Sequence, residues 1–541
     1  MIDKLSSQTR IILATVLSFL FFATYNYFFV PAKVVMQENN QTTQVEQSAL
    51  NAPVTKSADL NKPASLATSQ SQIKKSDGAI IATIKARNYE IRIDRLGRIS
   101  KFYLNDKKYV DETGERVQLI DPTLTPAPLE IRFSDENINA EAFATSYEAD
   151  SSDVVVGQNG TTLKLTQSLS QVKITKELTF FPNGHYSLHV SLNNPKEYFI
   201  TPGFRPNSAI DMYTFHGSLV IESDGTLETI ADGDAKGTEN FSAVKIAAAV
   251  DKYYTSLFYN FNTGLDVVVS SVHEESALLF IKGKSDFTLS GYIGPKEHKI
   301  LSSIDERLTN IIEYGFFTFI SKPLFSLLSF LYSLFGNWGW AIVVMTILIR
   351  TVLFPLTYKG MVSMNKLKEL SPKIKEMQAK YKGDKQKQNA MMMEMYKKHG
   401  ANPMGGCLPM ILQIPVFFSI YRVLQNTIEL KSAPWIFWVE DLAVMDPYYI
   451  LPVAMGITMF LHQRITPTNF TDPMQEKIMK FLPLIFTFFF VTFPAGLTLY
   501  WFTNNLFSIV QQTYVNRLFA KKKIVEVAAH KKEPLDKKAL K

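Results

Sequence analysis

Residues 339–359, GWAIVVMTILIRTVLFPLTYK, are apolar enough to predict a membrane-spanning helix, and Arg350 lies near the middle of this stretch. At about 1.5 Å per residue, Arg350 would be roughly 17 Å from Gly339 and roughly 13 Å from Lys359, too deep to reach either bilayer surface fully. An arginine at that depth costs roughly 2.5 to 3.5 kcal/mol on insertion scales, so such residues nearly always face a bundle interior or a water-filled cavity. The stretch therefore predicts a bundle of membrane helices with a polar interior.

Helical spacing gives Arg350 a polar face. Thr346, four residues before it, and Thr357, seven residues after it, fall on the same side of a continuous helix. Two environments would stabilise the guanidinium there, an ion pair with an intramembrane acid or a hydrated cavity. Because the other apolar segments carry no Asp or Glu deep within them, a hydrated cavity is the favoured prediction.

The composition is that of an integral membrane protein with a large soluble insert. Of 541 residues, 46% are hydrophobic and 39 are phenylalanine, and the apolar runs gather toward the two ends of the chain. The formal net charge is +7, but the placement of Lys and Arg beside the spans matters more, because it sets their orientation. The single cysteine, Cys407, excludes an intrachain disulfide, and packing is its expected role.

The N-terminal region predicts an anchor followed by a tether. Lys4 and Arg10 precede the apolar run 11–30, whose length and closing aromatic residues favour a transmembrane anchor (residues 1–30) over a cleaved signal peptide. Residues 31–77 are rich in Gln, Asn, Ser, Thr and Ala, which predicts a flexible periplasmic linker.

Residues 78–305 predict a large antiparallel β-sandwich. Short segments of alternating hydrophobicity recur between turn signals, and the clearest hairpin, VKITKELTFFPNGHYSLHVSL, turns at residues 182–184. Two of the histidines here, His185 and His189, are close in sequence, but on a strand they would stand about 13 Å apart, too far to share one metal ion. No catalytic motif or phosphate loop is recognisable, so we expect no enzyme activity, no metal and no cofactor.

Residues 306–336 predict an interfacial amphipathic helix. The run from Ile311 to Phe335 is hydrophobic enough to span, but Lys322-Pro323 interrupts it. A span here would also reverse the following helix and place residues 359–398, with eleven lysines and four acids, outside the cell. A helix that lies along the outer leaflet avoids this conflict.

Residues 361–400 predict a cytoplasmic helical hairpin, because apolar residues recur at three- and four-residue spacing on both sides of Lys382-Gly383-Asp384. Its lysines have two interpretations, contact with anionic lipid or ribosomal RNA and simple solvation on the positive side of the membrane. Its methionines form either an adaptable surface for client chains or the packing between the two helices. These methionines are Met377, Met391, Met392 and Met395.

Three further apolar segments complete the predicted core, residues 337–517. Residues 405–428 and 448–463 are expected spans, while 478–510 is too long for one span and is split at Pro494-Ala495-Gly496. With the N-terminal anchor this makes six spans. Both termini, including the basic tail 518–541, are then cytoplasmic.

The last span predicts a second polar wall opposite Arg350, because several of its polar side chains share one helix face. The span 405–428 adds two glutamines. Any single amide here has two interpretations of about equal weight, a wall of the cavity or a hydrogen bond between helices. The candidate site residues are Arg350, Thr346, Thr357, Gln413, Gln425, Tyr500, Trp501, Asn504 and Gln511.

Four motifs carry a resemblance to a known family: ILIRTVLFPLTYKGMVSMNKLKELSPKIKEMQ, NPMGGCLPMILQIPVFFSIYRVL, MDPYYILPVAMGITMFLHQ and FPAGLTLYWFTNNLFSIVQQ. Their order resembles the YidC/Oxa/Alb membrane insertase family, of the Gram-negative type with a large periplasmic domain. The resemblance implies an α-helical polytopic membrane protein whose five-helix core surrounds a hydrophilic groove, joined to a periplasmic all-β supersandwich domain. Arg350 matches the family's groove arginine, and Thr346, Tyr500 and Trp501 match positions near the client path.

The function implied by this resemblance is membrane protein insertion and chaperoning at the bacterial inner membrane. The implied partners are nascent inner-membrane proteins, the Sec translocon, membrane lipids and, through the basic loop and tail, the ribosome. Two other function classes remain, a secondary transporter that binds an anionic solute at Arg350 and a membrane-anchored periplasmic enzyme acting on glycans. Six spans without a visible inverted repeat weaken the first, and the lack of a recognisable pair of catalytic acids weakens the second.

Overall fold

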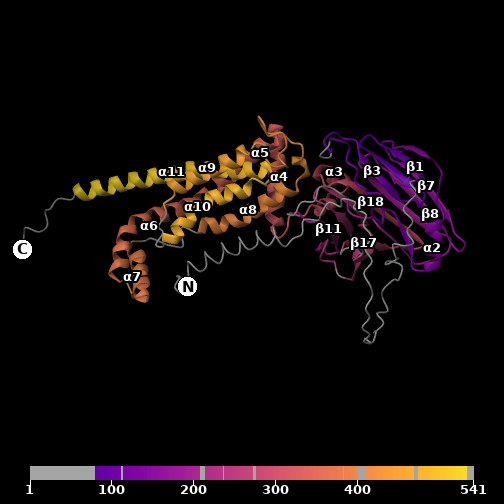
Figure 1. Ribbon diagram of the computed structural model, residues 1–541, viewed down its shortest axis with the longest axis horizontal. Helices are drawn as coiled ribbons and strands as arrows, with labels where there is room; N and C mark the ends of the chain where they lie inside the picture. The colour runs from indigo at the N-terminus through magenta and orange to yellow at the C-terminus, as the bar shows by residue number, and fades with distance from the viewer. Residues whose placement is uncertain are drawn as a thin grey trace, which may run out of the picture. The chain divides into compact units, whose positions relative to one another are not determined.

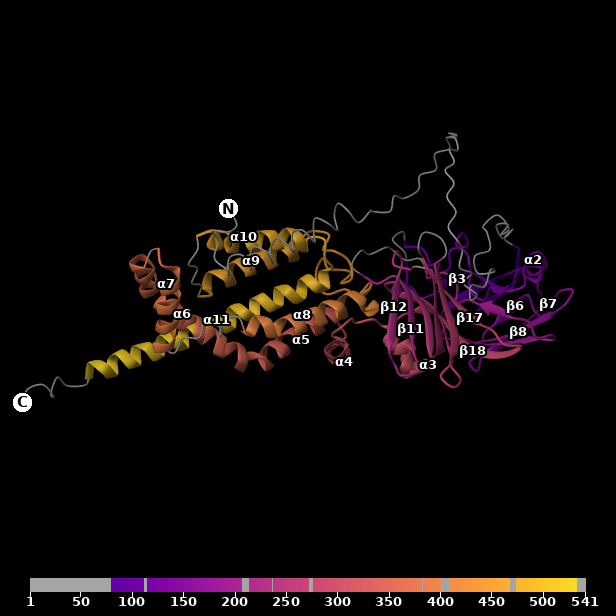
Figure 2. The same ribbon diagram turned by 90° about the horizontal axis from the view of Figure 1, so that it is seen from below.

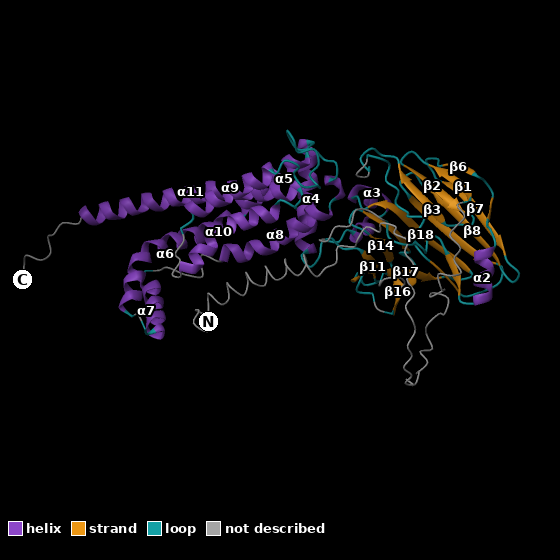
Figure 3. Ribbon diagram, in the orientation of Figure 1, coloured by secondary structure: helices purple, strands orange, loops and turns teal. Residues whose placement is uncertain are grey.

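The chain folds into a β-rich part followed by a helical part (Figure 1; Figure 3). The computed structural model describes residues 79–532 except for 111–113, 207–213, 236, 272–275, 382, 400–407 and 468–472. The predicted anchor, the predicted linker and Cys407 lie outside the described residues.

The described residues of the β-rich part form three sheets. The largest has nine strands in the order β12-β11-β14-β15-β18-β9-β8-β7-β5, the second has the order β13-β16-β17-β10-β4, and the third has the order β3-β2-β1-β6. The strands are β1 Ile80–Lys85, β2 Tyr89–Asp94, β3 Ile99–Leu104, β4 Ile131–Phe133, β5 Glu148–Ala149, β6 Asp153–Val155, β7 Thr161–Ser168, β8 Lys173–Phe180, β9 His185–Leu192, β10 Tyr198–Ile200, β11 Gly217–Ile221, β12 Leu227–Ala231, β13 Thr238–Val244, β14 Ile246–Val250, β15 Tyr254–Tyr259, β16 Leu265–Ser271, β17 Ala277–Lys282 and β18 Asp286–Pro295.

The predicted hairpin is confirmed by β8 and β9, which pair antiparallel in the large sheet. Buried residues alternate with more exposed ones along both strands, as a sheet with one face on the core requires. Gly184 closes the turn with φ of 85°, a left-handed conformation that favours glycine. A β-carbon there would also lie 2.9 Å from the carbonyl oxygen of Ile293. Any residue other than glycine at position 184 would therefore force the neighbouring backbone to shift.

The prediction of an all-β, antiparallel domain over residues 78–305 is wrong in its details, because two helices, α2 and α3 (His298–Ile304), and one parallel strand pair fall within it. Helix α2 (Glu136–Ala144) lies between β4 and β5, and the Asp135 side chain begins it by accepting hydrogen bonds from the backbone N–H groups of Asn137 and Ile138. Strands β1 and β6 pair in parallel, with Thr83 opposite Asp153. The sequence pattern of α2 is only weakly amphipathic, so the capping residue Asp135 was the main sign in the sequence that a helix begins here.

A buried lysine stabilises the interior of the β-rich part through backbone carbonyls. Lys176 on β8 donates hydrogen bonds from Nζ to the carbonyl oxygens of Gly97 (3.0 Å) and Leu129 (2.8 Å), and Nζ lies 4.5 Å from the ring centroid of Tyr147. Its side chain is fully buried. Burial disfavours the charged form and lowers the pKa of Lys176 to about 7.

The helical part is built around α11, which packs against α5, α8 and α9 (Figure 2). One described helix, α4, is long and apolar enough by itself to cross a bilayer, and the bent pair α5 and α6 is a second candidate if it counts as one span. The elements are α3 His298–Ile304, η4 Glu306–Ile311, α4 Thr318–Phe335, α5 Trp338–Val352, α6 Phe354–Lys380, α7 Lys385–Lys398, α8 Leu408–Asn426, η6 Ile428–Leu430, α9 Ile450–Ile465, α10 Pro473–Phe490 and α11 Ala495–Lys532.

The predicted interruption at Lys322-Pro323 is wrong, because α4 runs through Pro323. Pro323 is the sixth residue of α4 and, because it lacks an N–H group, it cannot donate to the carbonyl of Phe319. One face of α4 is buried, while Phe319 and Phe330 on the other are exposed. The expected position of this helix along the outer leaflet stays a prediction.

The prediction of one continuous helix from Gly339 to Lys359 is also wrong. The chain bends by 65° between α5, which ends at Val352, and α6, which begins at Phe354. Pro355 explains the break, because proline lacks an N–H group and is suited to the first turn of a helix but not to its interior. Arg350 therefore lies in the last turn of α5 rather than at the middle of a helix.

We predict that Lys176 makes the β-rich part more stable as the pH rises from 7.5 to 9.5. In this window the unfolded lysine keeps its proton while the folded one has lost it, so the unfolded state binds more protons and the free energy of unfolding increases with pH, by up to about 1.4 kcal/mol per pH unit. Lys176→Met should lack this increase. Urea unfolding of the full-length protein in detergent, followed by circular dichroism at both pH values, measures the difference.

The matched control is Lys173→Met, which removes an exposed lysine from the same strand. It should keep the pH dependence of the wild type. Parallel pH profiles for the wild type and Lys176→Met would contradict the prediction.

Candidate functional site

Arg350 connects three helices through one amide. The Arg350 guanidinium on α5 donates from Nε to Oδ1 of Asn504 on α11 over 2.6 Å. The same oxygen accepts a hydrogen bond from Nε2 of Gln413 on α8, at 3.3 Å. Arg350 forms no salt bridge with any residue that the structure describes. The guanidinium is therefore held by an uncharged partner and its positive charge is not neutralised.

The end of α5 suits a cation. The last four carbonyl groups of a helix have no partner within it and carry a partial negative charge, which favours Lys or Arg in the last turn. One of these carbonyls, that of Arg350 itself, accepts a hydrogen bond from Nε2 of Gln511 on α11 at 3.2 Å. Thus the same residue is fixed by α11 through both its side chain and its backbone.

A buried polar stripe on α11 faces this position. Its members recur at i, i+1, i+4, i+7 and i+8, which places them on one helix face. Each has between 1% and 6% of its surface exposed. The stripe consists of Asn504, Asn505, Ser508, Gln511 and Gln512.

Several buried polar atoms near this stripe are unpaired within the described part of the chain. They are Nε1 of Trp501, Nδ2 of Asn505 and Oε1 of Gln511, and Oε1 of Gln425 is a further such atom elsewhere, on α8. A buried polar group without a partner costs roughly 1 to 3 kcal/mol, so each of these atoms can gain free energy from a polar group that reaches it. The stripe and its neighbours thus have hydrogen-bonding capacity that the described residues do not use.

The structure divides the predicted site residues into two sets. Arg350, Gln413, Asn504 and Gln511 form one hydrogen-bonded cluster, which we call the Arg350 cluster. This arrangement combines both interpretations of the amides, since they join helices and also leave polar atoms unused.

The remaining predicted residues lie outside the cluster's hydrogen bonds. Thr346 and Thr357 donate to carbonyls of their own chain segments, at Ile342 and at Leu353 and Phe354. The expectation that Thr357 shares a helix face with Arg350 is wrong, because the 65° bend separates them.

Gln425 and the two aromatic residues have other neighbours. Nε2 of Gln425 donates to the Tyr421 hydroxyl at 3.3 Å. Tyr500 is buried one turn before Asn504, and the Trp501 ring lies 4.8 Å from that of Phe417 between ring centroids. Tyr500 and Trp501 thus belong to the aromatic surroundings of α8 and α11, while Gln425 forms a hydrogen bond within α8.

The hairpin methionines pack between α6 and α7. Met392 and Met395 lie against the buried cluster Leu367, Leu370 and Ile374. Met377 is buried and Met391 is partly buried. The contacts of Met392 and Met395 favour the interpretation in which the methionines hold the hairpin together.

Sequence reasoning missed a second polar layer, which lies beyond the Arg350 cluster toward the C-terminal end of α11. Oδ1 of Asn516 on α11 accepts hydrogen bonds from Asn365 on α6 (2.9 Å) and Gln512 (2.8 Å), and Nδ2 of Asn516 donates to the carbonyl of Ile465 on α9. Asn516 is four residues beyond Gln512, so continuing the helical spacing would have found it.

Arg422 has a carboxylate partner that the sequence did not indicate. Its Nη1 lies 3.6 Å from Oε2 of Glu313, which precedes α4 in the chain. The charge of Arg422 is thereby paired, unlike that of Arg350.

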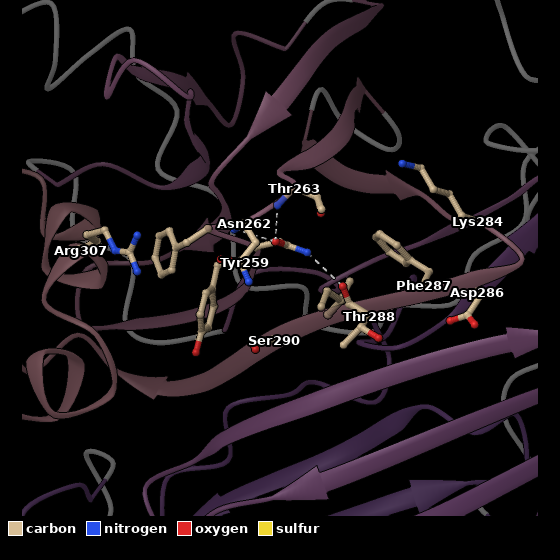
Figure 4. Close-up of a pocket in the computed structure, with 12 residues that line it drawn as sticks. Tyr259, Asn262, Thr263, Lys284, Asp286, Phe287, Thr288, Ser290 and Arg307 are labelled. Carbon is tan, nitrogen blue, oxygen red and sulfur yellow. Dashed lines mark hydrogen bonds between the residues drawn. The ribbon is translucent and has the colours of Figure 1, made fainter.

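A cavity of about 520 Å³ lies on the β-rich part, between the β15–β16 turn, β18 and Arg307 (Figure 4). In this view Arg307 and Lys284 lie at opposite ends of the lining. The Arg307 guanidinium is paired with Asp305 at 2.6 Å and stacks over Phe261. The charged groups of this cavity are paired, as in Arg307, or exposed, as in Lys284 and Asp286, so we favour the Arg350 cluster as the functional site.

Comparison with known proteins covers both parts of the chain. Residues 82–327 match the family model of the YidC periplasmic domain, and residues 330–523 match that of the 60Kd inner membrane protein. The chain is 53% identical over 522 residues to the membrane protein insertase YidC of Campylobacter jejuni, covering 96% of this chain and 98% of the relative. It is 52% identical over 525 residues to that of Wolinella succinogenes (96% and 97% covered) and 45% identical over 558 residues to that of Helicobacter pylori strain 26695 (98% and 100% covered).

Two neighbouring asparagines should respond oppositely to the same substitution. Asn504→Leu removes the acceptor of the Arg350 guanidinium and should destabilise the protein by roughly 1.5 to 3 kcal/mol, the typical worth of a hydrogen bond to a charged group. Asn505→Leu removes a side chain whose amide nitrogen is buried and unpaired, so it should be neutral or stabilising. Thermal unfolding of both variants in the same detergent measures the difference. Equal destabilisation would show that Asn504 is not the anchor of Arg350.

Proposed function

The chain belongs to the YidC family of membrane protein insertases, and from this premise we propose that it inserts clients by receiving their polar segments at the Arg350 cluster. The observation that carries this proposal is an arginine held by an amide, next to a stripe of buried polar groups with unused hydrogen-bonding atoms. A client's hydrophobic helix gains free energy by entering lipid, while its polar tail is opposed by the same apolar layer. A polar lining partway across that layer lowers the free-energy cost of moving the polar tail through it.

The choice of an amide partner matters for the electrostatics. A carboxylate at position 504 would cancel the charge of Arg350, whereas Asn504 orients the guanidinium and leaves its field in place. In a medium of low effective dielectric constant this field acts strongly on a nearby carboxylate. An acidic client tail would therefore be drawn inward without nucleotide hydrolysis.

The other named residues of the groove serve as its walls in this proposal. Tyr500 and Trp501 offer aromatic surface beside the stripe, and Gln425 offers an unpaired amide oxygen on α8. Thr346 lies on α5 one turn before Arg350, and in this proposal it belongs to the same wall.

The proposal places the lysine-rich hairpin and the basic end of α11 on the cytoplasmic side. Lysines of α6 and α7 are largely exposed, as are Arg517, Lys521 and Lys522 on α11. These groups would face the ribosome and the anionic leaflet during insertion. A chaperone role and cooperation with the Sec translocon are part of the same proposal, through the family resemblance.

In the six-span arrangement the loop before α9 is outside the cell and the hairpin is inside. In a Cys407→Ser background, a membrane-impermeant maleimide should label Phe437→Cys in intact cells, because Phe437 is 86% exposed in that loop. Glu394→Cys, exposed on α7, should react only after the membrane is opened. Labelling of the first position from the cytoplasm alone would contradict the arrangement.

Removing the charge of Arg350 should impair clients according to the charge of their tails. We predict that Arg350→Leu strongly reduces insertion of single-span clients with acidic tails and only slightly reduces that of neutral ones, because only the former gain from the field. Arg350→Lys keeps the charge and should retain much of the activity. Protease protection of both client types in liposomes containing the purified protein measures insertion.

Arg422→Leu is the matched control, since its charge is already paired with Glu313. It should affect acidic and neutral clients alike. A folded Arg350→Leu protein that inserts both client types as well as the wild type would remove Arg350 from the mechanism.

A further inference from the structure

A second cavity, of about 410 Å³, lies between α6, the end of α7 and α11. Its α6 wall is a single stripe with four-residue spacing, formed by Tyr358, Val362, Lys366 and Leu370. The client path described above does not use this cavity. Its volume is within the range of pockets that bind small molecules.

Two lysines approach the cavity from different helices. Lys366 belongs to α6 and Lys522 to α11, and His399 at the end of α7 adds a third basic side chain. Glu369 also borders the cavity, so cationic groups are in excess. Neither lysine forms a salt bridge with a side chain that the structure describes. The cavity therefore favours an anion.

The rest of the lining is apolar or aromatic. Val362 and Tyr358 precede Lys366 along α6, and Leu518 and Phe519 precede Lys522 along α11. Tyr358 and Val362 on α6, and Leu518 and Phe519 on α11, are thus nearer to α5 and the polar stripe than the lysine of the same helix, whereas Leu370 lies beyond Lys366. Further in that direction, Val510 and Tyr514 on α11 are exposed apolar surface. A ligand that matches this gradient carries a negative head group and a hydrocarbon body.

We propose that this cavity binds the phosphate head group of an anionic phospholipid, with the acyl chains directed along α11 past Tyr514. Basic pockets between membrane helices bind such head groups. Here two lysines supply the charge, and apolar side chains of α6 and α11 lie beside them. The site is preformed, since the hydrogen bond between Asn365 and Asn516 joins α6 to α11. A concave site with apolar walls and two lysines fits a single amphiphile better than the backbone of ribosomal RNA, which binds along extended basic surfaces.

The test measures phosphatidylglycerol bound to the full-length protein by native mass spectrometry, after titration in a neutral detergent. Lys366→Gln/Lys522→Gln should weaken binding roughly thirtyfold, from the loss of two lysines near an anionic group. The matched control is Lys373→Gln/Lys375→Gln, which removes two exposed lysines from α6 outside the cavity. This control should keep the wild-type affinity. Equal weakening by both pairs would mean diffuse attraction and would overturn the proposal.

A second variant tests the cavity without changing its charge. Val362→Trp fills the apolar end and should also displace phosphatidylglycerol, while phosphatidylcholine should bind weakly to every form of the protein. Displacement of the lipid by equimolar inorganic phosphate would identify a free-phosphate site and overturn the lipid assignment. Normal lipid binding by Lys366→Gln/Lys522→Gln, together with loss of ribosome cosedimentation, would identify an RNA surface and overturn it as well.

Discussion

The hydrogen bond from Arg350 to Asn504 is the interaction on which the helical part depends. It joins α5 to α11, and through the same amide oxygen it also recruits Gln413 of α8. A charged group among apolar helices is costly unless something polar stabilises it. Here the stabilisation comes from an amide and from the carbonyl end of a helix, which hold the guanidinium in place without cancelling its charge. The function proposed for the protein follows from that residual charge.

Local periodicity was enough to predict the elements that a single face defines. The hairpin of β8 and β9 follows from strict alternation, and the grouping of Asn504 and Gln511 with Arg350 follows from helical spacing and the need to stabilise a buried charge. The motifs also carried the family resemblance over the helical part. For the hairpin and for the face of α11 the information lies within a few residues of the feature, while the pairing of that face with Arg350 came from the need to stabilise a buried charge.

Features that depend on chain direction or on distant partners were not predictable in this way. The bend at Leu353 interrupts an apolar run that hydropathy treats as continuous, although Pro355 was a visible sign of it. Arg422 and Glu313 are far apart in sequence and meet only because α4 packs against α8. Likewise, Asn365 has no unusual neighbours along the chain, and its role appears only when α6 crosses α11.

The length of α11 places these separate features on one helix. With 38 residues and no proline, it is about 57 Å long as a straight helix, nearly twice the hydrocarbon thickness of about 30 Å. The polar stripe, Asn516 and Lys522 of the second cavity are all on this one helix. Because α11 is unbroken between Asn504 and its basic end, a rotation of the whole helix by one residue position, about 100°, would turn the amide away from Arg350.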